Sequence, residues 1–498
     1  MLIYLYFCSQ ITLIITTMLN IHQEAERCLL CVQSPCNAAC PKNLHPARGI
    51  RAVRFDDERN AYQWLTSACA DCDAPCEKAC IHTDFPIRIK ELSKKVNELG
   101  HAPRPETLPS LEIDFCGVHC ENPFFLASSA VCTDYDMIAR AFDWGWGGVV
   151  YKTITSQEIK EVSPRFDESD HWNGFRNMEQ LSEKPMEENF AIISRLKKNY
   201  PTKVVVASIM GQTEEEWIEL AKRAEAAGAD MVELNFSCPQ MKLANMGSDV
   251  GQNPELVAFY TGYVKHSVNI PVIPKMTPNI THISQPAFAA YCAGADGIAA
   301  INTIKSVTLS ERSKVSGKRT ISGYSGRAIK PIALRHILEL TTNPMLTKNH
   351  QMEVSGIGGI TTWRDALDFI QLGCANVQVC TSIMQFGYRI IEDMILGLRT
   401  YMADHHIEHL RDLVGSEISS FVRPSELDRE TKSFPKWNRD LCIGCGRCFI
   451  ACQDAGHQAI AFDTNRKPTL IGKNCVGCHL CRLVCPQQAI ESAGRIKV

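Results

Sequence analysis

Two dense groups of cysteines, one near each end of the chain, constrain its possible folds more than any other feature. Eight of the 24 cysteines lie between Cys28 and Cys80, and eight more lie between Cys442 and Cys485. A secreted disulfide-bonded protein is usually short and spreads its cysteines through one small domain. Dense groups at both ends of a 498-residue chain are instead typical of metal sites in a reducing compartment. We therefore expect a cytoplasmic protein that holds metal clusters.

The cysteines near the C-terminus follow the spacing of a bacterial two-cluster ferredoxin. Two runs each read Cys-x2-Cys-x2-Cys-x3-Cys, and Pro486 follows the second run. In such a pair, the fourth cysteine of each run ligates the cluster of the other run. Paired zinc knuckles are the alternative, although this spacing favours iron–sulfur clusters. The predicted ligands are Cys442, Cys445, Cys448 and Cys485 for one 4Fe–4S cluster, and Cys452, Cys475, Cys478 and Cys481 for the other.

The cysteines near the N-terminus are spaced differently. Their two runs read Cys-x2-Cys-x4-Cys-x3-Cys and Cys-x2-Cys-x3-Cys-x3-Cys, and Pro41 follows the first run. Eight thiolates can hold two further 4Fe–4S clusters, but a cysteine-rich zinc module is an alternative because these spacings are less standard. The residues concerned are Cys28, Cys31, Cys36, Cys40, Cys69, Cys72, Cys76 and Cys80.

Between residues 124 and about 400, short β-branched runs alternate with amphipathic segments such as residues 214–227 and 254–267. Gly228, Gly294 and Gly373 each follow a helical segment and lead directly into a strand, as helix C-caps do. Eight strand-plus-helix units predict a (β/α)8 TIM barrel. A doubly wound sheet would need a G-x-G-x-x-G turn after its first strand, and the sequence has none there. The expected strands are 123–127, 148–152, 204–208, 231–235, 271–275, 297–302, 353–357 and 376–380.

The first 20 residues carry no charge, but they lack the basic start and the small-residue cleavage site of a signal peptide. We interpret them as a mis-called start before Met18 or as a hydrophobic extension, with a membrane anchor as the alternative. A net charge of −3 favours neither nucleic acid nor an anionic membrane as a partner. The expected parts are this extension (1–20), an α-helical iron–sulfur module (21–105), an α/β barrel (106–402), a connecting arm (403–437) and a two-cluster ferredoxin domain (438–498).

Polar residues gather where the predicted strands end, which is the rim that carries the chemistry of TIM-barrel enzymes. A single one of them could be an ordinary loop residue, but so many together predict an active site. These residues are Ser128, Lys152, Asn235, Lys275, Asn302, Gly358, Gly359 and Thr381.

Several motifs resemble those of a known enzyme family. ELNFSCP, PKMTPN, AINT and SGIGGI resemble segments of the dihydroorotate and dihydropyrimidine dehydrogenases. NPFFLASSA, GWGGVVYKTIT, NMEQLSEK, SGRAIKPIALRHI and QVCTS narrow the resemblance to the dihydropyrimidine dehydrogenases, over roughly residues 110–490. CLLCVQSPCNAACP looks like the iron–sulfur segment that opens the fused enzyme of that family. In length the chain is more similar to the bacterial catalytic subunit than to the long animal enzyme.

The resemblance implies an FMN-dependent enzyme that reduces the 5,6 double bond of uracil or thymine in pyrimidine catabolism. Cys238 would donate the proton to C5 as general acid, since an ordinary thiol is protonated at pH 7. The implied FMN-binding residues are Ala127, Ser128, Lys152, Asn177, Asn235, Lys275, Asn302, Gly326, Gly358, Gly359, Cys380 and Thr381. The implied substrate-binding residues are Asn177, Glu179, Asn235, Ser237, Asn302 and Thr303.

The resemblance also assigns the N-terminal cysteines. It implies one cluster on Cys28, Cys31, Cys36 and Cys80, and three corners of a second on Cys40, Cys72 and Cys76. The family's fourth ligand is a glutamine, which this sequence lacks near Ser93, so Cys69 is our candidate for that corner. The segment after Cys238, residues 240–252, has fewer glycines than the family's mobile loop, which leaves the substrate's size open.

The resemblance further implies an electron-donating partner. In the family, FAD and NADPH domains follow the N-terminal clusters, whereas here the barrel begins almost directly after residue 100 without a glycine-rich nucleotide loop. We therefore expect electrons from a separate NAD(P)H-oxidising FAD subunit or another donor, in a homodimer or heterotetramer. The alternatives are a dihydroorotate dehydrogenase-like flavoprotein and a ferredoxin-type electron carrier whose barrel is not catalytic.

Overall fold

The computed structural model describes residues 19–497 except 101–103, 170–172, 239–246 and 348–351. Nearly all of the predicted N-terminal extension and most of the segment 240–252 therefore lie outside the described residues. Two compact units form the chain, and the second begins at Ser419. Among the described residues, no helix has the length and apolar character needed to cross a membrane.

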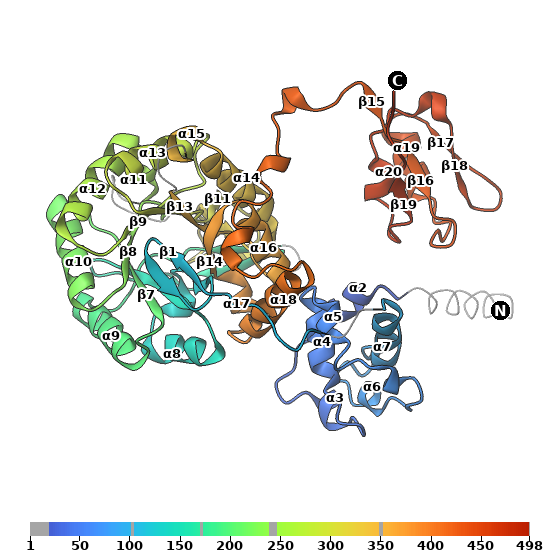
Figure 1. Cartoon of the computed structure of the whole chain (residues 1–498), viewed down its shortest axis with the longest axis horizontal. Helices are drawn as coiled ribbons and strands as arrows, with labels where there is room; N and C mark the ends of the chain where they lie inside the picture. Colours follow the sequence, from blue (N-terminus) through green and yellow to red (C-terminus); the bar gives the residue numbers. More distant parts are fainter. Residues whose placement is uncertain (1–18, 101–103, 170–172, 239–246, 348–351, 498) are drawn as a thin grey trace. The chain divides into compact units, whose positions relative to one another are not determined.

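Eight parallel strands close into a barrel in the order β10-β13-β14-β3-β4-β7-β8-β9, which confirms the predicted fold class (Figure 1). Each strand coincides closely with a run predicted from the sequence, because buried parallel strands read as short β-branched segments. The strands are β3 (Phe124–Leu126), β4 (Gly148–Ile154), β7 (Val204–Ile209), β8 (Met231–Asn235), β9 (Val272–Lys275), β10 (Gly297–Ala300), β13 (Glu353–Ile357) and β14 (Cys374–Val379).

Helices surround the barrel as an outer layer (Figure 1). The three glycines predicted to end helices all have positive φ, at +88° for Gly228, +93° for Gly294 and +105° for Gly373. The main helices are α8 (Tyr135–Trp144), α9 (Met186–Asn199), α10 (Glu214–Ala226), α12 (Pro254–Ser267), α13 (Ser284–Cys292), α14 (Lys330–Thr341), α16 (Trp363–Gln371) and α18 (Ile390–Asp404).

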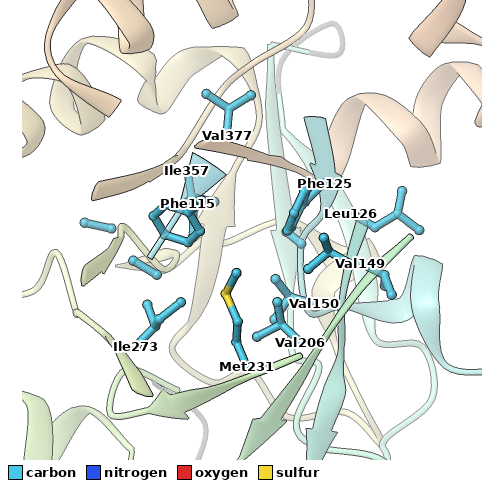
Figure 2. Close-up of a cluster of buried hydrophobic side chains, with 14 of the residues drawn as sticks. Phe115, Phe125, Leu126, Val149, Val150, Val206, Met231, Ile273, Ile357 and Val377 are labelled. Atoms are coloured by element: carbon cyan, nitrogen blue, oxygen red, sulfur yellow. The ribbon is translucent and has the colours of Figure 1, made fainter. Parts of the chain in front are cut away.

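The interior of the barrel changes from apolar to polar along its strands. Val150, Val206 and Met231 are register neighbours across three adjacent strands and belong to the buried core shown in Figure 2. Because side chains alternate faces along a strand, the residues two positions further on share the same face. Here those residues are polar, and Ser208 and Glu233 are direct register partners. A polar layer therefore lies toward the C-terminal ends of the strands.

Two small antiparallel sheets that the sequence patterns did not predict accompany the barrel. The hairpin of β1 (Ile113–Phe115) and β2 (Val118–Cys120) lies at the start of the barrel strands, where the Cys116 N–H donates to Glu353. The second sheet is formed by segments inserted after β4 and β10, and its strand order is β11-β12-β6-β5. Its strands are β5 (Phe166–Ser169), β6 (Gly174–Asn177), β11 (Ile304–Ser306) and β12 (Ser322–Ser325). This second sheet carries residues of the candidate site.

The N-terminal module is helical, as predicted, and has its own buried core, which includes Ile50, Val53, Leu92 and Val96. It packs against the barrel helices α16 and α18 through the Arg51 guanidinium, which lies 2.9 Å from Asp393, and through the Trp363 indole, which donates to the Asp56 carbonyl at 2.9 Å. Its helices are α2 (Ile21–Glu26), α3 (Pro35–Ala38), α4 (Pro46–Arg54), α5 (Glu58–Ala61), α6 (Pro75–Lys78) and α7 (Ile89–Glu98).

The described residues of the second compact unit form two α-helices, short 3-10 turns and three two-stranded sheets. Strands β15 (Thr431–Lys432) and β16 (Pro435–Trp437) belong to the segment predicted as a connecting arm, yet they pair with β20 (Ile496–Lys497) and β19 (Ile490–Ser492). The folded unit therefore includes residues before 438, because the arm supplies edge partners for these strands. The remaining elements are β17 (Ile460–Phe462), β18 (Pro468–Leu470), α19 (Arg447–Ala455) and α20 (Leu480–Leu483).

Candidate active site and cluster cavities

A cavity lies at the C-terminal ends of the barrel strands, and its empty space, which includes part of the open solvent at its mouth, amounts to about 1070 Å³. Every predicted cofactor- and substrate-binding residue lines it except Ser237. The residues that the structure brings together are Ala127, Ser128, Lys152, Asn177, Glu179, Asn235, Cys238, Lys275, Asn302, Thr303, Gly326, Gly358, Gly359, Cys380 and Thr381.

One end of this cavity is shaped by glycines. Gly358 follows β13 with φ +135°, and a Cβ there would lie 2.6 Å from the Ala333 Cβ. Gly359 has φ +78°, and a Cβ there would lie 2.8 Å from the Lys330 backbone nitrogen. Any other residue would be strained and would crowd the helix behind it, so the loop keeps its backbone N–H groups open. Such a loop suits a phosphate group.

Two buried lysines enter the cavity from β4 and β9. Lys152 and Lys275 are each 4 % exposed, and each is paired with a carboxylate. The Lys152 ammonium donates to Glu179, and the Lys275 Nζ lies 3.5 Å from the Glu233 Oε1. Glu179 lines the cavity, whereas Glu233 lies beneath it among the strands. Both pairs are therefore held away from bulk solvent.

Arg165 is a site residue that the sequence analysis missed. Its Nε lies 2.9 Å from the Glu179 Oε1, and its Nη1 donates to Glu183 at 3.1 Å. Burial would lower the pKa of Arg165, but the attraction of Glu179 and Glu183 raises it overall. The segments around Arg165 and Glu179 are also joined where the Gln180 N–H donates to Glu161 at 2.6 Å. Glu179 therefore lies between two cations.

The Ser237 hydroxyl orients two of the predicted amide side chains, those of Asn235 and Asn302. The Ser237 hydroxyl donates to the Asn235 Oδ1 at 3.0 Å and accepts from the Asn302 Nδ2 at 2.8 Å. The Asn235 Nδ2 donates to Thr153 at 2.9 Å, so that amide is fixed at both ends. Ser237 thus lies behind the cavity wall, where it holds the two amides that face the cavity.

Two thiols line the cavity. Cys238 follows β8 and is 5 % exposed, beside the region of Asn235 and Asn302. Cys380 follows β14, and burial raises the pKa of its thiol. Cys132 lies near Cys380 and is fully buried, which raises the pKa of its thiol to about 12. Burial therefore keeps the Cys380 and Cys132 thiols in the protonated form at neutral pH.

Gln378 and the aromatic residues Phe166 and Phe175 also line the cavity, although the sequence analysis did not single them out. The Gln378 Nε2 donates to Glu233 at 3.3 Å and to Ser355 at 3.0 Å, while its buried Oε1 has no hydrogen-bond partner among the described residues. A signal for Gln378 and Glu233 was present, since each is a polar residue inside a buried and mostly apolar barrel strand.

The cavity fits an FMN molecule. Its glycine-shaped end can accept a phosphate, and the hydroxyls of Thr381 and Ser382 lie at the start of the helix that follows β14. The unpartnered Gln378 oxygen can accept a hydrogen bond from a ring N–H. The two buried lysines can stabilise negative charge on a ring placed between them. Phosphate, ring and charge thus have matching groups in one cavity.

In the second compact unit, two cavities each collect four cysteines. One is lined by Cys442, Cys445, Cys448 and Cys485, and the other by Cys452, Cys475, Cys478 and Cys481. These are the ligand sets predicted from the two runs, including the exchange of the fourth cysteine between them. Four thiolates around one cavity suit a cubane cluster.

The N-terminal module repeats this arrangement. Cys28, Cys31, Cys36 and Cys80 line one cavity. Cys40, Cys69, Cys72 and Cys76 line another, so the structure places Cys69 at the corner for which the sequence offered no glutamine. All sixteen predicted cysteine ligands are therefore gathered in groups of four.

Three known families match successive parts of the chain. Residues 110–402 match the family described as dihydroorotate dehydrogenase. Residues 8–103 match dihydropyrimidine dehydrogenase domain II with its 4Fe–4S cluster, and residues 436–492 match a 4Fe–4S dicluster domain. The two cluster families cover both cysteine-rich ends, which supports iron–sulfur clusters over zinc at each end.

Relatives of known name cover most of the chain. The NAD-dependent dihydropyrimidine dehydrogenase subunit PreA of Escherichia coli is 51 % identical over 398 residues, which are 78 % of this chain and 96 % of that protein. The chloroplastic dihydropyrimidine dehydrogenase (NADP⁺) of Arabidopsis thaliana is 35 % identical over 66 % of this chain and 81 % of its own. The catalytic subunit of dihydroorotate dehydrogenase B (NAD⁺) of Pyrococcus horikoshii is 35 % identical over 61 % of this chain and 97 % of its own.

Proposed function

Because this chain belongs to the dihydroorotate dehydrogenase family, and within it to the dihydropyrimidine dehydrogenases, we propose that it reduces the 5,6 double bond of uracil or thymine. The observation that supports this most is the cavity, which combines a phosphate cradle, two buried lysines, several amides and two thiols. FMN, held at the glycine-shaped end of the cavity and beside the two buried lysines, would supply the hydride for C6 of the pyrimidine. 4Fe–4S clusters on the four groups of cysteines would relay electrons to this site from an external donor.

The polar residues of the cavity orient the pyrimidine ring. Each ring N–H needs an acceptor and each carbonyl needs a donor, and an amide side chain offers both. Asn177, Asn235 and Asn302 provide these amides, and Ser237 fixes two of them. Glu179 accepts from a ring N–H, and its carboxylate is held in place by Lys152 and Arg165. Thr303 also lines the cavity and provides a further hydrogen-bonding group for the ring.

Cys238 completes the reduction by giving a proton to C5. Hydride addition at C6 leaves negative charge at C5, which must be neutralised in the same event or directly after it. Cys238 lines the cavity and is shielded from bulk water, so the proton comes from the thiol and not from solvent. The thiolate is afterwards reprotonated from solvent.

The cluster ligands lead to a prediction for metal content. Anaerobically purified protein should contain about 16 iron and about 16 acid-labile sulfide atoms per chain if all four cubanes form. Metal and sulfide analysis measures this directly, with FMN quantified in the same sample. About eight iron atoms together with stoichiometric zinc would instead mean that the N-terminal module binds zinc.

The electron donor can be identified by reconstitution. NADH or NADPH alone should leave the bound flavin oxidised, whereas dithionite or an NAD(P)H-oxidising FAD subunit should restore reduction of uracil. Anaerobic flavin absorbance, followed with and without uracil, measures both steps. Turnover with NAD(P)H by the single purified chain would contradict the need for a partner. In the cell we expect this complex in the cytoplasm, as a homodimer or as a heterotetramer with the donor subunit.

A further inference from the structure

Glu233 is a buried acidic residue to which the proposed reaction assigns no role. Its side chain lies inside the barrel on β8, and the residue is 1 % exposed. The neighbouring inward residue of the same strand, Met231, belongs to the apolar core. Burial of a carboxylate is unfavourable unless it is paired and hydrogen-bonded. An apolar side chain at this position would avoid that cost, so the charge itself requires an explanation.

The contacts of Glu233 connect it to the floor of the cavity. Its Oε1 accepts from the Ser208 hydroxyl at 3.0 Å and lies 3.5 Å from the Lys275 Nζ. Its Oε2 accepts from the Gln378 Nε2 at 3.3 Å. Lys275 and Gln378 both line the cavity, whereas Glu233 and Ser208 do not. Glu233 therefore has no direct contact with the cavity; it can act on a bound flavin by holding Lys275 and Gln378, and at a distance through its charge.

The two cavity lysines differ in whether their partner carboxylate lines the cavity. Lys152 is paired with Glu179, which lines the cavity and is proposed to engage the substrate. Lys275 is paired with Glu233, which is buried beneath the cavity and does not line it. A pyrimidine in the cavity would not contact Glu233, so the carboxylate under this side of the site is not shared with the substrate.

We propose that Glu233 is a positioning residue that fixes the Lys275 ammonium and offsets its charge, and so lowers the reduction potential of the bound flavin. Reduction by two electrons and one proton leaves one negative charge on the flavin ring; the electrons come from the 4Fe–4S clusters and the proton from solvent. Lys275 stabilises that charge, and Glu233 opposes it. The opposing charges of Lys275 and Glu233 thus keep the reduction potential low enough for the reduced flavin to donate electrons. This inference rests on FMN binding in the cavity but not on the identity of the substrate.

The test is the midpoint potential of the FMN-loaded protein, measured by anaerobic spectroelectrochemistry without pyrimidine. Glu233→Gln removes the charge but keeps the size and most of the hydrogen bonds. We expect the equilibrium constant for two-electron reduction of the flavin to rise about tenfold in this variant. This change corresponds to a midpoint potential that is higher by about 30 mV. Ser208→Ala is the matched control, because it removes a hydrogen bond to the same carboxylate and keeps the charge. Its potential should equal that of the wild type.

A second comparison covers the case in which Glu233→Gln destabilises the barrel by leaving Lys275 buried alone. The double variant Glu233→Gln with Lys275→Gln removes the pair together, which buried ion pairs often tolerate. Its potential should exceed that of Lys275→Gln alone by a similar amount. An unchanged reduction potential in both comparisons would overturn the proposal. Loss of FMN from both variants that lack Glu233 would also overturn it, because Glu233 would then have a structural role. Uracil turnover plays no part in this measurement, so the proposed function and this inference can fail separately.

Discussion

Cys238→Ala should lower the rate of uracil reduction by a factor of about 10²–10⁴, or roughly 3–5 kcal/mol of barrier. The substitution removes the proposed proton donor, while Asn235 and Asn302 remain held by Ser237 and continue to bind the ring. Affinity for the pyrimidine should therefore change little, and dithionite should still reduce the flavin. Single-turnover kinetics with pre-reduced protein, combined with equilibrium binding of uracil, separates the two effects.

The remaining variants at this position and a control make the test specific. Cys238→Ser should have an intermediate rate, since a hydroxyl can relay a proton but is a much weaker acid than a thiol. Cys132→Ala is the matched control, because Cys132 is also a buried cysteine but does not line the cavity. It should retain the wild-type rate. If Cys238→Ala instead weakens binding and leaves turnover unchanged, Cys238 is a packing residue and the acid lies elsewhere.

A chain truncated after Ile418 should lose turnover driven by the external donor but keep turnover driven by dithionite. The second compact unit begins at Ser419, and it contains eight of the cysteines predicted to ligate clusters. A cut at residue 438 would remove β19 and leave its partner β16 without a neighbour, so the earlier boundary is the better one. Without these two clusters, the flavin should remain bound yet receive no electrons from the donor subunit.

A comparison of turnover driven by dithionite with turnover driven by the donor subunit shows which function the truncation removes. Equal FMN content and equal dithionite-driven turnover in the truncated and full chains would show that the barrel is intact. Donor-driven turnover that survives the truncation would contradict the prediction, and it would mean that electrons enter through the N-terminal module alone. Loss of both activities would show that the second unit is needed for the barrel itself.

Local patterns were sufficient to predict the barrel and the C-terminal cysteine sets of this protein. The eight barrel strands could be predicted because each is a short β-branched run between helical segments, and both depend on neighbours in the sequence. The C-terminal cysteine sets could also be predicted, because the x2 spacings reflect how a loop wraps around one cluster. The prediction that Cys452 and Cys485 exchange places between the two clusters agrees with the cavities that they line.

The contacts that give the site its charge could not be predicted in this way. Lys275 and Glu233 are separated by 42 positions, and they meet only because β8 and β9 are neighbours in the barrel with Asn235 opposite Lys275. Arg165 reaches Glu179 because the inserted strands β5 and β6 pair with each other, and no periodic pattern in the sequence revealed these strands. Cys69 joins Cys40 only through the folding of the helical module.

The sequence by itself therefore determined the strands and helices of the barrel and which residue types reach its C-terminal rim. The tertiary structure alone decided which side chains pair there, which of them face the cavity and which lie behind it, as Ser237 does. The physical reason is that strand formation and cluster loops depend on residues a few positions apart, whereas the pairing of charges depends on strand order and register, which bring together residues that are far apart in the chain.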